Sequence, residues 1–255
     1  MPLVLVTSAL VLLLSAAAPV AEARPWRPDI AAARAYADQR TGHITFAVRT
    51  PQRLYAIGGS RTTSSASLVK AMLLVAYLNR EAVRGRQLTG AERALLGPMI
   101  RRSANANATR VRDIVGNRAL ERIANRVGMM DFVTASTWGA TQVSARDQAE
   151  LFFDIDRMTV RRHRAFALEL LSSVAPDQRW GVARARPPGW SLFFKSGWYE
   201  DIGTNHQSAL LRRGDRRVAV SILGTGGLSH TYAKRTLREV ARRLLSGLRP
   251  DSVPR

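Results

Sequence analysis

The sequence contains no cysteine among its 255 residues. A disulfide framework and a thiolate metal site are therefore excluded, and so is a lipid anchor on a cysteine. Lysine is nearly as rare, because only Lys70, Lys195 and Lys234 occur among 39 basic residues. Arginine stays protonated at any working pH, whereas a desolvated lysine can lose its proton and act as a base. The three lysines are therefore candidates for chemistry that arginine cannot perform.

Acidic residues are also scarce, which leaves a formal net charge of +20. Such a charge favours anionic partners, whether nucleic acid, acidic lipid or an anionic wall polymer. A bias toward arginine over the whole surface explains the same charge without a partner, and we favour that explanation. Because no nucleic-acid-binding motif accompanies the charge, we predict no nucleic-acid partner. Contact with an anionic wall polymer stays open.

The N-terminal segment is apolar from Val4 to Ala18, and Ala21-Glu22-Ala23 fits a signal-peptidase site. The apolar run is too short for a comfortable membrane span. We therefore predict a signal peptide over residues 1–23, a secreted or extracytoplasmic protein, and no membrane span after cleavage. A buried N-terminal helix is the alternative.

Strand-like patterns lie near both ends of the chain, and helical patterns lie between them. The predicted strands are Ile44–Arg49, Leu54–Ile57, Ser191–Phe194, Gln207–Leu211 and Val218–Leu223. We predict an α+β fold with an antiparallel sheet built from N- and C-terminal strands and flanked by helices, with an inserted all-helical subdomain. Residues 24–255 would form one domain, in which 24–65 and about 175–255 make the α/β part and about 66–174 the helical part.

A serine and a lysine stand three residues apart in Ser67-Leu68-Val69-Lys70, where a run begins that is apolar nearly all round to Leu78. Such a run is typical of a helix buried in the core. On a helix this spacing places both side chains on one face, one turn apart. A serine hydroxyl becomes a useful nucleophile when a neighbouring base takes its proton, and burial lowers the pKa of a lysine toward that role.

Two further short motifs carry groups suited to binding a substrate. Lys195-Ser196-Gly197 follows the predicted strand Ser191–Phe194 and offers a cation, a hydroxyl and a residue without a side chain. These groups suit a carboxylate and an extended substrate backbone. Ser103-Ala104-Asn105 follows a helix break and offers a hydroxyl and an amide. Taken singly, the first motif is equally typical of a strand end with a turn glycine, and the second of a helix cap.

Together and in this order, the three motifs resemble the signature Ser-x-x-Lys, Ser-x-Asn, Lys-(Ser/Thr)-Gly of penicillin-binding proteins and serine β-lactamases. The surrounding sequence is similar to the class A β-lactamase-like branch, and the likeness covers about residues 28–248. The stretches that carry it are Leu88-Thr89, Leu95, Met99-Ile100, Ile114-Val115-Gly116, Ala119-Leu120, Arg126-Val127-Gly128 and Pro188-Gly189-Trp190.

The resemblance implies a serine hydrolase that works through an acyl-enzyme, without a cofactor or a metal. Its substrate would be a β-lactam or a peptidoglycan-derived peptide like D-Ala-D-Ala. The catalytic residues would be Ser67 as nucleophile, Lys70 as base, Ser103 as proton relay and Lys195 as the cation beside it. The substrate-binding residues would be Asn105, Ser196, Gly197 and Trp198, and the backbone N–H groups of Ser67 and Trp198 would hold the oxyanion.

The sequence departs from the class A branch in the residues that serve deacylation. That branch has a glutamate ahead of the helix that here begins near Ser144, but Met129–Val143 holds only Asp131 as an acid. Ala104 and Thr109 stand where that branch has an aspartate and an asparagine. We therefore expect β-lactams to acylate Ser67 and to leave slowly. A D,D-peptidase or an esterase fits the same residues, and a non-catalytic wall- or β-lactam-binding module of the same fold is the alternative.

The four histidines show no metal-ligand spacing, so no metal site is predicted. His206, which follows Trp198 and Tyr199 closely, either lines the cleft with them or packs locally. Trp180-Gly181 is assigned to the cleft floor by position alone.

Overall fold

The computed structural model describes residues 25–227 and 229–253. The predicted signal peptide, residues 1–23, lies outside the described residues. Within the described ranges, every helix is too short or too polar to cross a membrane. The helices are α1 (Ile30–Ala37), α2 (Lys70–Leu78), α3 (Glu81–Arg84), α4 (Gly90–Arg101), α5 (Asn105–Val115), α6 (Asn117–Val127), α7 (Ala145–Met158), α8 (Arg164–Ser172) and α9 (His230–Leu244). The strands are β1 (His43–Arg49), β2 (Leu54–Ile57), β3 (Thr63–Ser64), β4 (Gln142–Val143), β5 (Ser191–Tyr199), β6 (Thr204–Arg213) and β7 (Arg216–Thr225).

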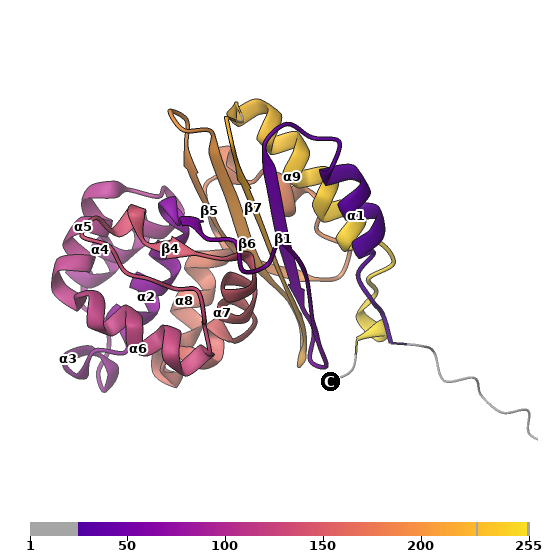
Figure 1. Cartoon of the computed structure of the whole chain (residues 1–255). Helices are drawn as coiled ribbons and strands as arrows, with labels where there is room; N and C mark the ends of the chain where they lie inside the picture. Colours follow the sequence, from indigo (N-terminus) through magenta and orange to yellow (C-terminus); the bar gives the residue numbers. More distant parts are fainter. Residues whose placement is uncertain (1–24, 228, 254–255) are drawn as a thin grey trace, which may run out of the picture.

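A five-stranded antiparallel sheet in the order β2-β1-β7-β6-β5 forms the centre of the fold. The N-terminal strand β1 pairs with the C-terminal strand β7, and Phe46 lies opposite Ile222. Both ends of the chain therefore build one sheet, and a mostly helical part lies beside it (Figure 1). The predicted α+β fold, with its sheet from both termini and its helices inserted between them, is confirmed.

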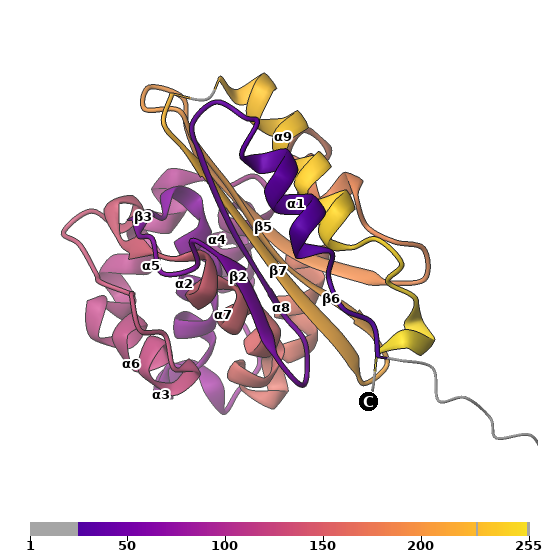
Figure 2. The same cartoon turned by 45° about the vertical axis from the view of Figure 1, so that its right-hand side comes forward.

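Helices cover both faces of the sheet. Helices α1 and α9 pack against each other over one face (Figure 2), whereas α7 and α8 contact the other. Side chains of β6 alternate between the two layers: Leu210 belongs to the core shared with the helical part, and Ala209 and Leu211 belong to the core under α9. Burial on both faces explains why β6 contains consecutive apolar residues, Ala209-Leu210-Leu211, rather than a strict alternation of apolar and polar residues.

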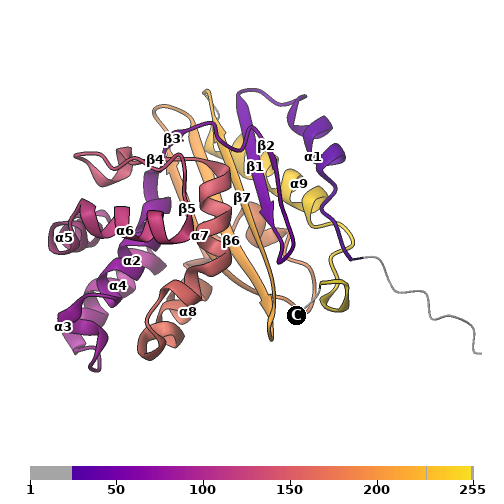
Figure 3. The same ribbon diagram turned by 60° about the horizontal axis from the view of Figure 1, so that its bottom comes forward.

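Helix α2 runs through the middle of the helical part, and α3 follows beyond its far end (Figure 3). All nine residues of α2 are buried, as the apolar run predicts. Helix α4 begins at a capping box in which Thr89 and Glu92 bond reciprocally to backbone N–H groups. The nucleophile candidate therefore stands at the start of a helix whose position is fixed by core packing.

Strands β3, β4 and β5 differ most from the sequence expectation. Strand β5 continues to Tyr199 instead of ending at Phe194, because it pairs with β6 up to Thr204. The polar residues at its far end conceal this continuation in the sequence. The two short strands β3 and β4 pair with each other in a separate small sheet. They tie the chain just before Ser67 to the segment before α7.

Candidate active site

Ser67 lies in a 3-10 turn, Ala66–Val69, that leads directly into α2 at Lys70. The preceding residue, Ala66, has a φ of +45°, and Ser103 on the other side of the cleft has a φ of +57°. Residues with side chains rarely adopt this left-handed conformation, and each instance costs on the order of 1–3 kcal/mol. Such strain is concentrated at functional sites, and here it falls on the residue before one predicted catalytic serine and on the other serine itself.

The amine of Lys70 is held by the Ser103–Asn105 turn. Its Nζ donates to the carbonyl oxygen of Ser103 at 2.5 Å, to Ser103 Oγ at 3.2 Å and to Asn105 Oδ1 at 2.8 Å. It also lies 4.6 Å from the centre of the Trp138 ring, which is a cation–π distance. The Ser67 hydroxyl makes no hydrogen bond to any part of the chain that the structure describes. Lys70, from the motif that begins at Ser67, thus contacts the motif Ser103-Ala104-Asn105. The Ser67 hydroxyl, which lines the cleft, stays available for a substrate.

Lys195 reaches the same serine from the sheet. Its Nζ donates to Ser103 Oγ at 3.1 Å and to the carbonyl oxygen of Ser196 at 2.8 Å. Both lysine side chains are fully buried. One hydroxyl therefore lies within hydrogen-bond distance of two buried amines, an arrangement in which a proton can pass from one amine through the hydroxyl to a third group.

Burial has a strong effect on both amines, because it disfavours their charged forms. It lowers the pKa of Lys70 to about 7. Burial, assisted by the charge on Lys70, lowers the pKa of Lys195 well below its ordinary value. At neutral pH a substantial fraction of Lys70 is therefore unprotonated and can accept a proton.

These groups open onto a cleft of about 350 Å³ between the helical part and β5. A cleft of this size can enclose most of a small ligand. Its lining consists of Ser67, Arg102, Ser103, Asn105, Trp138, Asp177, Gln178, Trp198 and Tyr199.

Strand β5 is the edge strand of the sheet, and its open edge packs against the turn that carries Ser67. A Cβ atom placed on Gly197 would lie 2.8 Å from the backbone nitrogens of both Ser67 and Leu68. Only a residue without a side chain allows this approach. The next residue, Trp198, stacks on His230 with ring centres 5.2 Å apart, and His230 bonds to Asn205 at 2.7 Å. The edge of β5 beside Ser67 is thereby fixed.

Ser196, His206 and Trp180 are not among the residues that line the cleft, and for His206 this agrees with the alternative of local packing. The Ser196 side chain is fully buried and accepts a hydrogen bond from Gln207 at 2.9 Å, because consecutive residues of a strand point to opposite faces and Lys195 takes the cleft face. The fully buried His206 contacts the carbonyl oxygen of Ser64 at 3.1 Å, and burial lowers the pKa of His206 to about 4. Trp180 packs against Trp198 and His230 behind the cleft. All three support the site from behind instead of lining it.

Asp177 is the sole carboxylate among the residues that line the cleft. Asp131, the acid noted before α7, is not in this lining. Its backbone N–H donates to Asp147 at 2.8 Å, and this bond holds the segment against the start of α7. Within the described residues, no group of three or more histidine, cysteine, aspartate or glutamate side chains is placed to hold a metal ion.

Sequence reasoning missed Trp138, Arg102, Asp177 and Gln178 as cleft residues. Arg102 precedes Ser103 directly, and this adjacency was the one signal that could have marked it. Trp138 belongs to a short 3-10 turn, Trp138–Ala140, in which a Cβ atom on Gly139 would lie 2.0 Å from the Tyr199 hydroxyl. That contact joins segments 60 residues apart, and no local pattern reveals it.

Comparisons with known proteins identify the family and the fold. A model of a beta-lactamase enzyme family matches residues 91–248. A β-lactamase from Sphaerobacter thermophilus superposes with a TM-score of 0.74 at 17% identity, covering 87% of this chain and 98% of that one. An ancestral class A β-lactamase (GNCA) superposes at 0.70 with 16% identity, covering 84% and 98%. The protein PBP-A superposes at 0.69 with 15% identity, covering 86% and 96%. No curated protein sequence matches the chain.

Proposed function

The chain belongs to the beta-lactamase enzyme family, and from that premise we propose that it is a serine hydrolase that β-lactams or D-Ala-D-Ala-like peptides acylate on Ser67. The observation that carries the proposal is the convergence of two buried amines on the Ser103 hydroxyl, in the cleft that Ser67 also lines. Ser67, Lys70, Ser103 and Lys195 are the proposed catalytic residues, and Asn105, Gly197 and Trp198 the proposed substrate-binding residues.

The proposed reaction begins when Ser67 Oγ attacks the substrate carbonyl and gives its proton to the neutral amine of Lys70. The carbon–nitrogen bond then breaks, and the departing nitrogen receives a proton through Ser103, which both lysines contact. The backbone N–H groups of Ser67 and Trp198 would stabilise the negative oxygen that forms during the attack. A substrate backbone would lie along the open edge of β5, as extended peptides do on exposed sheet edges.

The sequence prediction of Ser196 as a substrate-binding residue is modified by its placement. Its hydroxyl lies 3.4 Å from the carbonyl oxygen of Gln178, which lines the cleft, and accepts from Gln207. We therefore propose that Ser196 positions Gln178 and the edge of β5 and does not contact the substrate directly.

Deacylation is proposed to be slow. It requires a base that activates a water against the acyl-enzyme. The cleft lining contains one carboxylate, Asp177, and it follows the helical part of the chain instead of preceding α7. A stable acyl-enzyme fits a penicillin-binding protein better than an efficient β-lactamase. The second candidate, a non-catalytic wall- or β-lactam-binding module, is favoured by the same observation, that no carboxylate from the segment before α7 is among the described lining residues.

The proposal is tested by incubating the purified protein with a penicillin and following its intact mass over time, beside Ser67→Ala. A lasting adduct on the wild-type protein alone supports slow hydrolysis or penicillin binding, and an adduct that clears at once indicates a β-lactamase. No adduct with any β-lactam, or one that persists in Ser67→Ala, removes the assignment. The same mass, measured on protein recovered from outside the producing cell, tests export: loss of residues 1–23 is expected.

The pH dependence of acylation follows from the pKa of Lys70. The neutral amine is the base, so its fraction falls about tenfold for each pH unit below the pKa. Burial places that pKa at about 7. We expect the second-order rate constant of acylation to rise with pH and to level off above about 7. Stopped-flow measurement with a fluorescent penicillin checks the profile, and a rate constant independent of pH through this range contradicts Lys70 as the base.

A further inference from the structure

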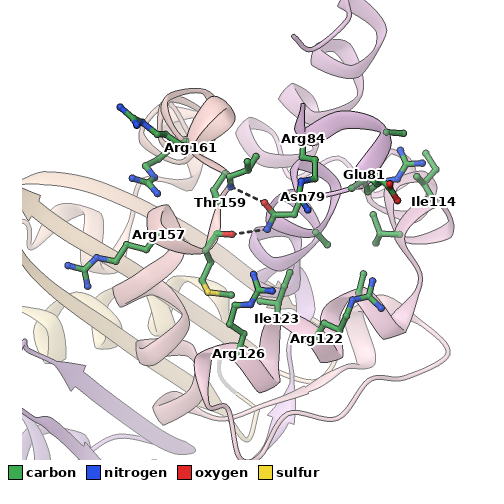
Figure 4. Close-up of a pocket in the computed structure, with 18 residues that line it drawn as sticks. Asn79, Glu81, Arg84, Ile114, Arg122, Ile123, Arg126, Arg157, Thr159 and Arg161 are labelled. Atoms are coloured by element: carbon green, nitrogen blue, oxygen red, sulfur yellow. Dashed lines mark hydrogen bonds between the residues drawn. The ribbon is translucent and has the colours of Figure 1, made fainter. Parts of the chain in front are cut away.

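A larger cavity, of about 830 Å³, lies in the helical part, at the end of α2 that is remote from Lys70. Its walls come from the end of α2, from α3 and α6, and from the segment that joins α7 to α8. Seven arginines and a single acid, Glu81, are among its lining residues. The arginines are Arg80, Arg84, Arg122, Arg126, Arg157, Arg161 and Arg164. In Figure 4, Arg157 and Arg161 lie on one side of Asn79, and Arg84 and Arg122 lie on the other.

Most of these arginines have no partner of opposite charge. Arg157 pairs with Asp154 at 3.0 Å. The side chains of Arg84, Arg122, Arg126 and Arg161 make no hydrogen bond or ion pair with any residue that the structure describes. Like charges gathered without counter-charges repel one another, and an anion relieves that repulsion. The cavity thus has unused capacity to bind negative charge.

One guanidinium carries a further indication. The Nε of Arg164 is buried and has no hydrogen-bond partner in the described part of the chain. Buried donors in native proteins are nearly always satisfied, so one that is left unsatisfied beside a cavity needs an explanation. An anion or a water in the cavity supplies one.

Hydrogen bonds within the chain fix one wall of the cavity. Asn79, at the end of α2, donates to the carbonyl oxygen of Met158 at 2.7 Å and accepts from the N–H of Val160 at 2.8 Å. These two bonds fix the segment after α7 to the end of α2 (Figure 4). Arg161 lies on that segment, Arg157 in the last turn of α7 and Arg84 on α3, so their backbones are positioned before any ligand arrives. A preformed site loses less entropy on binding.

We propose that this cavity is a binding site for a linear anion that carries several phosphoryl groups. A single carboxylate would bind one or two guanidinium groups, which is far fewer than the seven arginines that line the cavity. Each phosphoryl group offers several acceptor oxygens and up to two charges, and planar guanidinium groups bind such oxygens in pairs. The cavity volume fits the ordinary range for ligand sites. The site is separate from the Ser67 cleft and does not depend on the proposed hydrolase function.

Isothermal titration of the full protein with sodium tripolyphosphate tests the proposal. We expect saturable binding that weakens steeply as salt is raised. The triple variant Arg84→Gln, Arg122→Gln, Arg126→Gln should bind at least about tenfold more weakly, because it loses charge-assisted hydrogen bonds from two walls. Thermal unfolding and circular dichroism establish that the variant is folded.

The matched control is Arg27→Gln, Arg61→Gln, Arg235→Gln, which removes the same charge from exposed arginines outside the cavity lining. It should bind like the wild-type protein. Equal weakening in both triple variants would assign binding to net charge and overturn the proposal, and so would a wild-type protein that shows no saturable binding. If the wild-type protein shows no saturable binding and the cavity variant is less stable to heat, the arginines only stabilise the fold, by offsetting the partial negative charge at the C-terminal ends of α2, α5 and α7.

Vesicles identify the source of the phosphoryl groups. The protein is sedimented with vesicles of phosphatidylglycerol and, separately, of phosphatidylcholine. Lipid headgroups would be identified as the source if the protein binds only the phosphatidylglycerol vesicles, if tripolyphosphate displaces it from them, and if the cavity variant no longer binds them. Tripolyphosphate binding without vesicle binding would identify a soluble or polymeric phosphate. Each result supports the cavity as the site, whereas vesicle binding that the cavity variant retains contradicts it.

Discussion

Replacing Lys70 by arginine is expected to lower the acylation rate of Ser67 by about 10²- to 10⁴-fold, nearly as much as replacing it by alanine. Arginine keeps the positive charge, but it cannot lose its proton at any working pH. The lysine amine does so readily, because burial lowers its pKa to about 7. If Lys70 acts as a base, charge alone cannot replace it.

The comparison of the two variants separates the base role from an electrostatic one. If the amine only held Ser103 and Asn105 in place, arginine would preserve much of the rate and alanine would not. The rate constant of acylation by a fluorescent penicillin is the measurement. Lys234→Arg makes the same exchange on α9, outside the cleft lining, and should leave the rate unchanged. A Lys70→Arg protein that is acylated at the wild-type rate would contradict the mechanism.

The sequence predicted the architecture because its signals are local. The apolar run after Ser67 and the strand-like runs near both ends of the chain each specify an element within a few residues. The scarcity of lysine marked Lys70 and Lys195, and the structure brings both to the Ser103 hydroxyl. Rarity of a residue type was informative here because arginine occupies the positions where only a charge is needed.

The other features of the cleft depend on contacts between distant segments. Ser196 faces Gln207 and not the cleft because β5 continues past Lys195 in register with β6, which requires the whole hairpin. Trp138 meets Lys70 only because the segment before α7 folds over the start of α2. Neither arrangement has a period or a spacing in the sequence. The arginine cavity is a similar case, since its seven members come from segments up to 84 residues apart.

The close approach of β5 to the Ser67 turn makes Gly197→Ala the second variant with a large expected effect. The added Cβ atom would lie 2.8 Å from the backbone nitrogens of Ser67 and Leu68 and 2.9 Å from the carbonyl oxygen of Ser65. Atoms at such distances overlap, and backbone atoms cannot swing aside as a side chain can. Either the turn or the strand edge must therefore move.

Either movement separates the two N–H groups that are proposed to hold the oxyanion, those of Ser67 and Trp198. Loss of one oxyanion donor typically lowers the rate about 10²- to 10³-fold, and we expect acylation of Gly197→Ala to fall by that factor. Gly90→Ala is the control, because a Cβ atom there meets nothing within 4 Å. Thermal unfolding of both variants shows whether the fold persists. Acylation of Gly197→Ala at the wild-type rate would mean that the oxyanion is held elsewhere, because the β5 edge and the Ser67 turn cannot both keep their positions once this side chain is present.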